Sequence, residues 1–83
     1  MEQLEYEQII RFRKEEYNRN GFNALEISRD ELQKLTGSRK ADIPVIEEAM
    51  RQCMLEGDRA DETDGFMVTY YCDNLGPDRR KMY

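Results

Sequence analysis

The sequence predicts an α+β fold in which three helices are combined with a C-terminal β-hairpin. Three observations support this prediction. An apolar stripe at helical spacing opens the chain, two capped helical segments follow it, and a run of β-forming residues ends at Cys72. The segment between the first two helices leaves room for a third short strand.

Residues 3–19 are predicted to form the first helix, because apolar positions recur near the helical period and no Gly or Pro interrupts them. The expected buried stripe is Leu4, Tyr6, Ile9, Ile10, Arg13 and Tyr17, widened by Phe12. Asn20 or Gly21 supplies the left-handed cap that ends the helix. In residues 22–27, Leu25 and Ile27 alternate around Glu26, which indicates a brief strand that would pair beside the hairpin.

The second helix is predicted to begin at a capping box formed by Ser28 and Glu31. In such a box the Ser hydroxyl and the Glu carboxylate satisfy reciprocal backbone N–H groups. Leu32 and Leu35 follow at helical spacing, and Gly37 closes the element. Ser28 is therefore expected to be a helix cap without a catalytic role.

The third helix is predicted to run to Glu56 and to stop at Gly57. Its N-cap is either Ser38 or Asp42, and Pro44 favours Asp42 because proline is tolerated only in the first helical turn. With Asp42 as the cap, residues 38–41 become a longer turn or a single preliminary turn. The expected buried face is Ile43, Ile46, Ala49, Met50, Cys53 and Met54.

Beyond Gly57 the pattern changes to strands. Residues 66–72 are dense in β-forming residues, Asp64 and Gly65 form a favoured hairpin turn, and the polar residues 58–63 are expected to form an edge strand. Residues 74–83 contain a Gly-Pro break and little apolar content, which indicates a flexible tail. The predicted organisation is one domain over residues 1–73, followed by the tail 74–83.

Composition restricts the classes of function. The chain has 83 residues, of which 37% are charged and 39% are hydrophobic, and its net charge is −5. This charge disfavours nonspecific attraction to nucleic acid or to an anionic membrane. No apolar run approaches the ~18 residues of a membrane span, and no signal-peptide pattern opens the chain. A soluble, cytoplasmic protein is expected.

No catalytic or metal-binding constellation emerges from the sequence. Histidine is absent, and the two cysteines, Cys53 and Cys72, are expected to be buried thiols, with an oxidation-sensitive pair as the alternative. The acidic segment from Asp58 to Asp64 lacks the alternating ligands of a calcium loop. No Gly-rich phosphate-binding loop is present. The sequence therefore predicts neither an enzyme nor a cofactor.

The order helix, turn, helix and β-hairpin over residues 4–72 resembles the winged helix-turn-helix superfamily in architecture and capping. The resemblance implies that the start of the third helix approaches the major groove of DNA and that the hairpin tip touches backbone or minor groove. The residues it implies for DNA binding are Arg29, Lys34, Ser38, Arg39, Lys40, Arg51 and Arg59, with Arg79, Arg80 and Lys81 as a basic arm. The protein would then be a small transcriptional regulator.

The acidic hairpin favours a second interpretation on the same fold. Residues 56–64 contain five carboxylates against Arg59 alone, a local charge of −4 that would repel phosphate. The alternative is an acidic interaction module or inhibitor that docks on a basic protein surface. Its binding residues would be Glu47, Glu48, Asp61 and Glu62, with Phe66, Tyr70 or Tyr71 as aromatic anchors where exposed and as core residues otherwise.

On the fold resemblance, DNA binding ranks ahead of protein docking. Binding to duplex DNA would then require a narrow basic patch and a dimer, because the net charge of the chain is unfavourable. The long first helix offers a surface on which two copies would pair as a homodimer.

Overall fold

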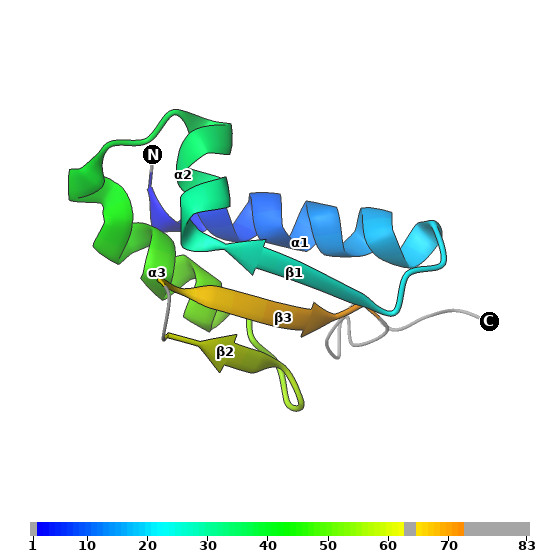
Figure 1. Cartoon of the computed structure of the whole chain (residues 1–83). Coiled ribbons are helices and arrows are strands. Elements are labelled where there is room, and N and C mark those ends of the chain that lie inside the picture. The colour runs from blue at the N-terminus through cyan, green and yellow to red at the C-terminus, as the bar shows by residue number, and fades with distance from the viewer. Residues whose placement is uncertain (1, 63–64, 73–83) are drawn as a thin grey trace.

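The part of the chain that the structure describes folds into three α-helices, a 3-10 turn and a three-stranded sheet (Figure 1). The computed structural model describes residues 2–62 and 65–72. In chain order the elements are α1 (Gln3–Arg19), β1 (Ala24–Ser28), α2 (Arg29–Thr36), the 3-10 turn η1 (Lys40–Asp42), α3 (Ile43–Gln52), β2 (Arg59–Asp61) and β3 (Met67–Tyr71). The predicted α+β class, the three helices and the third strand are confirmed. Asp64 of the predicted hairpin turn and the predicted tail 74–83 lie outside the described residues.

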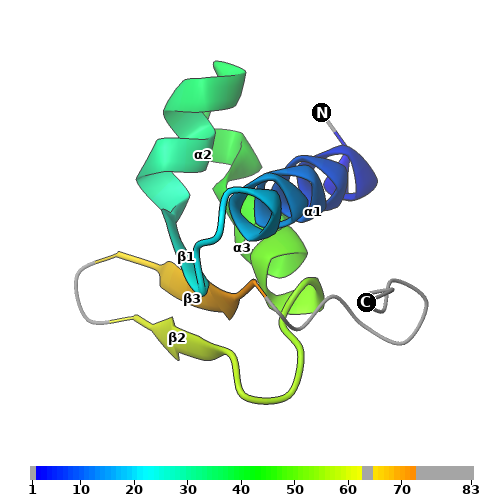
Figure 2. The ribbon, with the colours of Figure 1, turned by 90° about the vertical axis from the view of Figure 1, so that its right-hand side faces the viewer.

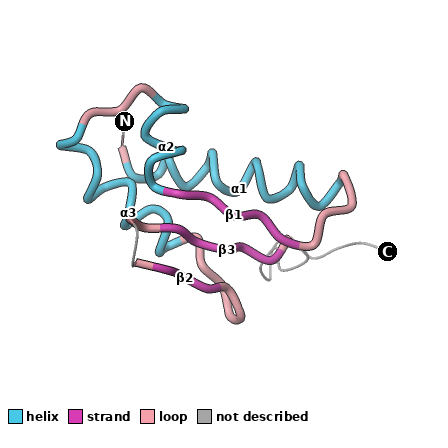
Figure 3. The backbone as a smooth tube through the Cα atoms, viewed as in Figure 1, coloured by secondary structure: helices cyan, strands magenta, loops and turns pink. Residues whose placement is uncertain are grey.

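The sheet is antiparallel, with the strand order β1-β3-β2 (Figure 3). β3 is therefore central, and it pairs with β1 through Leu25 opposite Tyr70 and Ile27 opposite Val68. β2 pairs with the other side of β3, and all three of its residues are exposed. β2 is thus the polar edge strand that the sequence predicts.

The three helices lie on one face of the sheet, and none of the described elements covers the other, which we call the open face (Figure 2). Burial alternates along and beside β3: Phe66, Val68 and Tyr70 are buried, whereas Met67 between them is exposed. Alternate side chains of a strand point to opposite faces, so the buried set faces the helices. The core between the two layers consists of Tyr6, Ile10, Leu25, Ile27, Leu32, Ile46, Ala49, Met50, Cys53, Phe66, Val68, Tyr70 and Cys72.

The bounds predicted for α1 are confirmed, but its buried side is narrower than predicted. Tyr6 and Ile10 are fully buried, whereas Leu4 and Phe12 are 57% and 58% exposed. Leu4 and Phe12 each lie two residues from a buried position, which is about 200° around the helix. The prediction that Leu4 and Phe12 belong to the buried face was therefore wrong. Lys14, which the sequence did not suggest for the core, is buried on the inner side.

α2 begins and ends as predicted, but only half of its capping box forms. The Ser28 hydroxyl accepts a 3.1 Å hydrogen bond from the Glu31 backbone N–H. The Glu31 carboxylate instead accepts a 3.2 Å hydrogen bond from Arg13 on α1. Gly37 closes α2 with φ 65°, a left-handed conformation that suits glycine.

α3 begins at Ile43 after the single turn η1, as Pro44 predicts, and Asp42 is its N-cap residue. The Asp42 carboxylate does not cap α3; it accepts a 3.0 Å hydrogen bond from the Arg39 backbone N–H. The helix ends at Gln52, so the predicted end at Glu56 was wrong.

The early end of α3 has a tertiary cause in Asp58. The two carboxylate oxygens of Asp58 accept hydrogen bonds from the backbone N–H groups of Leu55, at 2.9 Å, and Tyr71, at 3.0 Å. These bonds hold the chain after α3 against the end of β3. They favour a turn where the local sequence would have continued the helix.

Candidate interaction surface

A chain of ion pairs crosses the exposed side of α3. Arg29 Nη1, at the start of α2, lies 2.8 Å from Glu47 Oε2 on α3. Glu47 Oε1 lies 3.9 Å from Arg51 Nη2, one turn further along α3. Arg51 Nη2 lies 3.3 Å from Glu62 Oε1, just after β2. We call Arg29, Glu47, Arg51 and Glu62 the charge ladder.

Phe66 ties the charge ladder to the sheet. The Arg51 guanidinium lies 4.7 Å from the centre of the Phe66 ring, within the range of a cation–π contact. The Arg29 backbone N–H donates a 2.7 Å hydrogen bond to the Phe66 carbonyl. The hydrogen bond from the Arg29 side chain to Glu47 raises the pKa of Arg29 above its ordinary value. The ladder thus joins α2 and α3 to the hairpin just after β2 and just before β3.

The charge ladder combines members of both predicted binding sets. Arg29 and Arg51 were predicted to bind DNA, whereas Glu47 and Glu62 were predicted to bind a protein partner. The structure brings these residues together in alternation, so two cations and two carboxylates balance one another. A phosphate that approached either arginine would have to compete with a carboxylate already in place.

Ser38, the predicted major-groove residue, belongs to a cluster of hydroxyl groups. Its Oγ lies 2.5 Å from the Tyr6 hydroxyl on α1 and 2.5 Å from Thr36 Oγ1 on α2. Its backbone N–H donates a 3.0 Å hydrogen bond to the Gln33 carbonyl. Ser38 therefore fastens the turn between α2 and η1 to α1.

Three of the predicted DNA-binding cations lie between residues 34 and 40. Lys34 is in the last turn of α2, Arg39 directly precedes η1 and Lys40 begins it, and all three are exposed. Arg59 lies elsewhere, because it is in register with Thr69, whose side chain is on the open face of the sheet. The predicted basic arm of Arg79, Arg80 and Lys81 lies outside the described residues.

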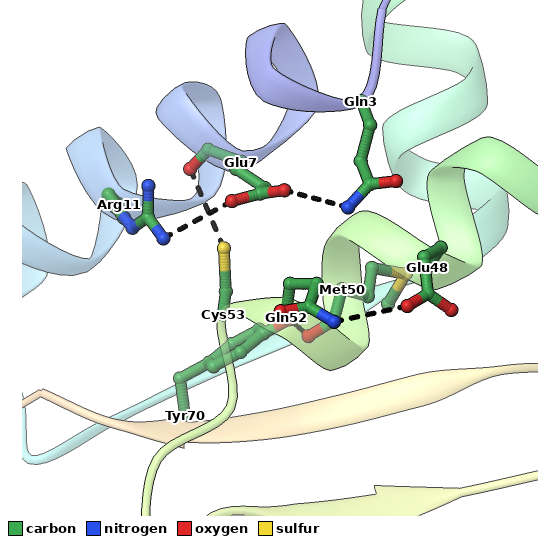
Figure 4. A network of polar contacts seen from close by, with 8 residues as sticks. All are labelled: Gln3, Glu7, Arg11, Glu48, Met50, Gln52, Cys53 and Tyr70. Atoms are coloured by element: carbon green, nitrogen blue, oxygen red, sulfur yellow. Dashed lines mark hydrogen bonds and ion pairs between the residues drawn. The ribbon is translucent and has the colours of Figure 1, made fainter.

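The acidic residues near α3 differ in what they contact. Glu48 is exposed, and its carboxylate accepts a 3.1 Å hydrogen bond from Gln52 Nε2 (Figure 4). Asp61 is exposed on β2, in register with Met67, so its side chain is on the open face of the sheet, as that of Arg59 is. Asp58 is engaged in its two backbone hydrogen bonds and Glu62 in the charge ladder. Glu48 and Asp61 are thus the members of the predicted protein-binding set that lie outside the ladder.

The aromatic residues proposed as anchors are mostly core residues. Phe66 is 3% exposed and Tyr70 is fully buried, which confirms the prediction that alternate aromatic residues of this strand fill the core. Tyr71 is half-buried on the opposite face. Phe66 and Tyr70 therefore do not meet the condition of exposure under which the sequence allowed them to be anchors.

Cys53 lies in a polar seam between α1 and α3 (Figure 4). Its thiol donates a 3.6 Å hydrogen bond to the Glu7 carbonyl, and burial raises the pKa of this thiol to about 11. The Glu7 carboxylate accepts hydrogen bonds from Gln3 and Arg11. Cys53 and Cys72 are both buried thiols that form no disulfide, as the sequence predicts. A protonated, buried thiol is a poor nucleophile at neutral pH.

Residues 2–62 and 65–72 contain neither a metal-binding cluster nor a membrane-spanning helix. Within these ranges no three Cys, Asp or Glu side chains gather closely enough to hold a metal ion. Among the same residues, no helix has both the length and the apolar character that crossing a membrane requires.

The charge ladder could not be read from the sequence, because Arg29 and Glu47 are 18 residues apart on different helices. Only its Glu47–Arg51 step has a local signal, since charges four residues apart face each other on a helix. No protein-family model, no curated protein and no solved structure matches this chain.

Proposed function

We propose that this chain is a small winged-helix-like regulatory module that binds a basic protein surface through the acidic side of α3 and β2. The observation that carries the proposal is the charge ladder. It pairs Arg29 and Arg51 with carboxylates, whereas Glu48 on α3 and Asp61 at the end of the edge strand β2 are exposed outside it.

The order of the elements supports the winged-helix resemblance. Two short helices, α2 and α3, are joined by a turn, and the β2–β3 hairpin follows them. β3 of this hairpin also pairs with β1. In winged helices the second helix of such a pair is the usual contact surface. In this chain that helix is α3.

The charges on α3 support a protein partner over DNA. The exposed and half-buried polar side chains of α3 are Glu47, Glu48, Arg51 and Gln52, so carboxylates outnumber cations. Binding to phosphate gains free energy when cations displace counterions, and carboxylates work against it. A partner that presents Lys or Arg would instead find complementary charge, which speeds association and fixes orientation.

Charge reversal on the proposed surface tests this function. We would capture partners from extracts of the source cells with the wild-type chain and with Glu48→Lys, Asp61→Lys and Glu26→Lys. The control, Glu26→Lys, makes the same change of charge at an exposed position of β1. We expect to recover one partner protein that binds to the wild type and to the control variant but binds to neither of the two test variants. Equal recovery by all four proteins would contradict the proposal.

DNA binding remains the second candidate, and the exposed cations at the turn between α2 and η1 favour it. Lys34, Arg39 and Lys40 would hold phosphates there. Fluorescence titration with duplex DNA at about 50 mM salt measures this directly. DNA binding predicts saturable binding that Arg39→Ala and Lys40→Ala weaken and Arg59→Ala leaves unchanged. Absence of binding by the folded protein would remove this candidate.

A further inference from the structure

The outer side of α1 presents apolar side chains that no described element covers. Phe12 and Leu4 are both more than half exposed. Phe12 also lines a shallow pocket together with Glu5, Gln8 and Ile9. Figure 2 looks close to the axis of α1 and shows α2, α3 and the sheet to the left of the helix and below it. Among the described elements, none lies over the opposite side.

Charges are placed symmetrically about Phe12 on this side. Glu5, Phe12 and Arg19 are seven residues apart, which is nearly two helical turns, so they lie along one line on α1. Glu5 and Arg19 are both exposed and carry opposite charges at equal distances from Phe12. The line is therefore acidic at one end, aromatic in the middle and basic at the other end. Such a surface is complementary to itself when a copy is turned end for end.

We propose that the outer side of α1 binds a second copy of this chain, with the two α1 helices antiparallel and Phe12 at the two-fold axis. In this register Glu5 of each copy faces Arg19 of the other copy. Gln8 of each copy faces Glu16 of the other, and its amide is able to donate to that carboxylate. When the axes of two packed helices lie 8–10 Å apart, the side chains that face each other across the pair are in contact.

Charge selects the antiparallel arrangement over the parallel one. A parallel pair would place Glu5 against Glu5 and Arg19 against Arg19, and facing like charges are destabilising. The apolar contact comes from Phe12, with Ile9 beside it. One pair of helices forms an interface at the small end of the known range, so we expect a Kd of about 10–100 µM. This surface is separate from α3 and does not depend on the function proposed above.

Sedimentation equilibrium over concentrations from about 5 to about 500 µM tests the dimer. We expect the wild type to dimerise and Phe12→Lys to weaken dimerisation by about tenfold or more. Leu35→Lys is the matched control, because Leu35 is 54% exposed on α2. The control should leave the Kd unchanged. A wild type that is monomeric throughout, or a dimer that Phe12→Lys leaves intact, would overturn the proposal.

Charge reversals test the register. Glu5→Arg alone and Arg19→Glu alone should each weaken dimerisation, whereas the double variant should restore the wild-type Kd, because it exchanges the two charges in each pair. Failure of the double variant to recover would overturn the antiparallel arrangement. Circular dichroism establishes that every variant is folded, and all three substituted positions on α1 are exposed.

Discussion

The Tyr70 hydroxyl donates a 2.7 Å hydrogen bond to the Met50 carbonyl in the core, where it joins β3 to α3 (Figure 4). Burial raises the pKa of Tyr70, so the hydroxyl keeps its proton throughout the physiological range. This contact fixes the distance between the helical layer and the sheet at one point.

Tyr70→Phe should lower the free energy of unfolding by about 1–2 kcal/mol, because it leaves the buried Met50 carbonyl without its donor. Urea denaturation followed by circular dichroism measures the change. Tyr71→Phe is the control: Tyr71 is half-buried on the open face, and its substitution should cost less than about 0.5 kcal/mol. Equal effects of the two substitutions would show that the hydrogen bond does not contribute.

Gly37→Ala should destabilise the protein by about 1 kcal/mol, because Gly37 has φ 65° and a side chain with Cβ is strained in that region. The cost is conformational rather than steric, since no atom lies within 4 Å of the position that a Cβ would take. Gly37→Asn should therefore cost less, as Asn tolerates the left-handed conformation. Thermal denaturation of the two variants compares them, and a more stable Gly37→Ala would contradict this explanation.

Alkaline pH should destabilise the protein through Cys53. Its pKa in the folded chain is about 11, against an ordinary value of 9.0. Between these values the unfolded chain loses the thiol proton while the folded chain keeps it, so the free energy of unfolding falls as pH rises. Urea denaturation at pH values between about 8 and 10 should show a steeper loss for the wild type than for Cys53→Ala. Parallel pH profiles would contradict the assignment.

The Arg29–Glu47 pair of the charge ladder should stabilise the packing of α2 against α3 in a salt-dependent way. Arg29→Gln and Glu47→Gln should each lower the melting temperature, because each single change leaves the other charge without its partner in the pair. The double variant should therefore lower the melting temperature by less than the sum of the two single effects. The coupling from this double-mutant cycle should shrink between about 50 mM and about 500 mM salt, as screening increases. Additive effects at low salt would mean that the two groups do not interact.

The sequence was sufficient for features that depend on neighbouring residues. Helical periodicity and the absence of breakers defined α1, Gly37 defined the end of α2, and Pro44 located the start of α3. Each of these signals acts within one or two turns of the backbone, so the folded environment had little to change.

Features that depend on contacts between distant residues could not be predicted from the sequence. α3 ends early because Asp58 binds the backbone N–H of Tyr71, thirteen residues further along the chain. Phe12 appeared to be a core residue because apolar character alone does not say how wide a face the neighbouring elements will cover. The ladder pairing of Arg29 with Glu47 likewise required the packing of α2 against α3. The two predicted binding sets could therefore not be seen as one surface.

The position of β3 in the chain has a consequence for synthesis. β3 is the last of the three strands to leave the ribosome, yet it is the strand with which both β1 and β2 pair. Until Met67–Tyr71 has emerged, the backbone N–H and C=O groups of β1 and β2 have no partner within the sheet. A nascent chain that stops before Met67 therefore exposes two unpaired strands, which are templates for aggregation.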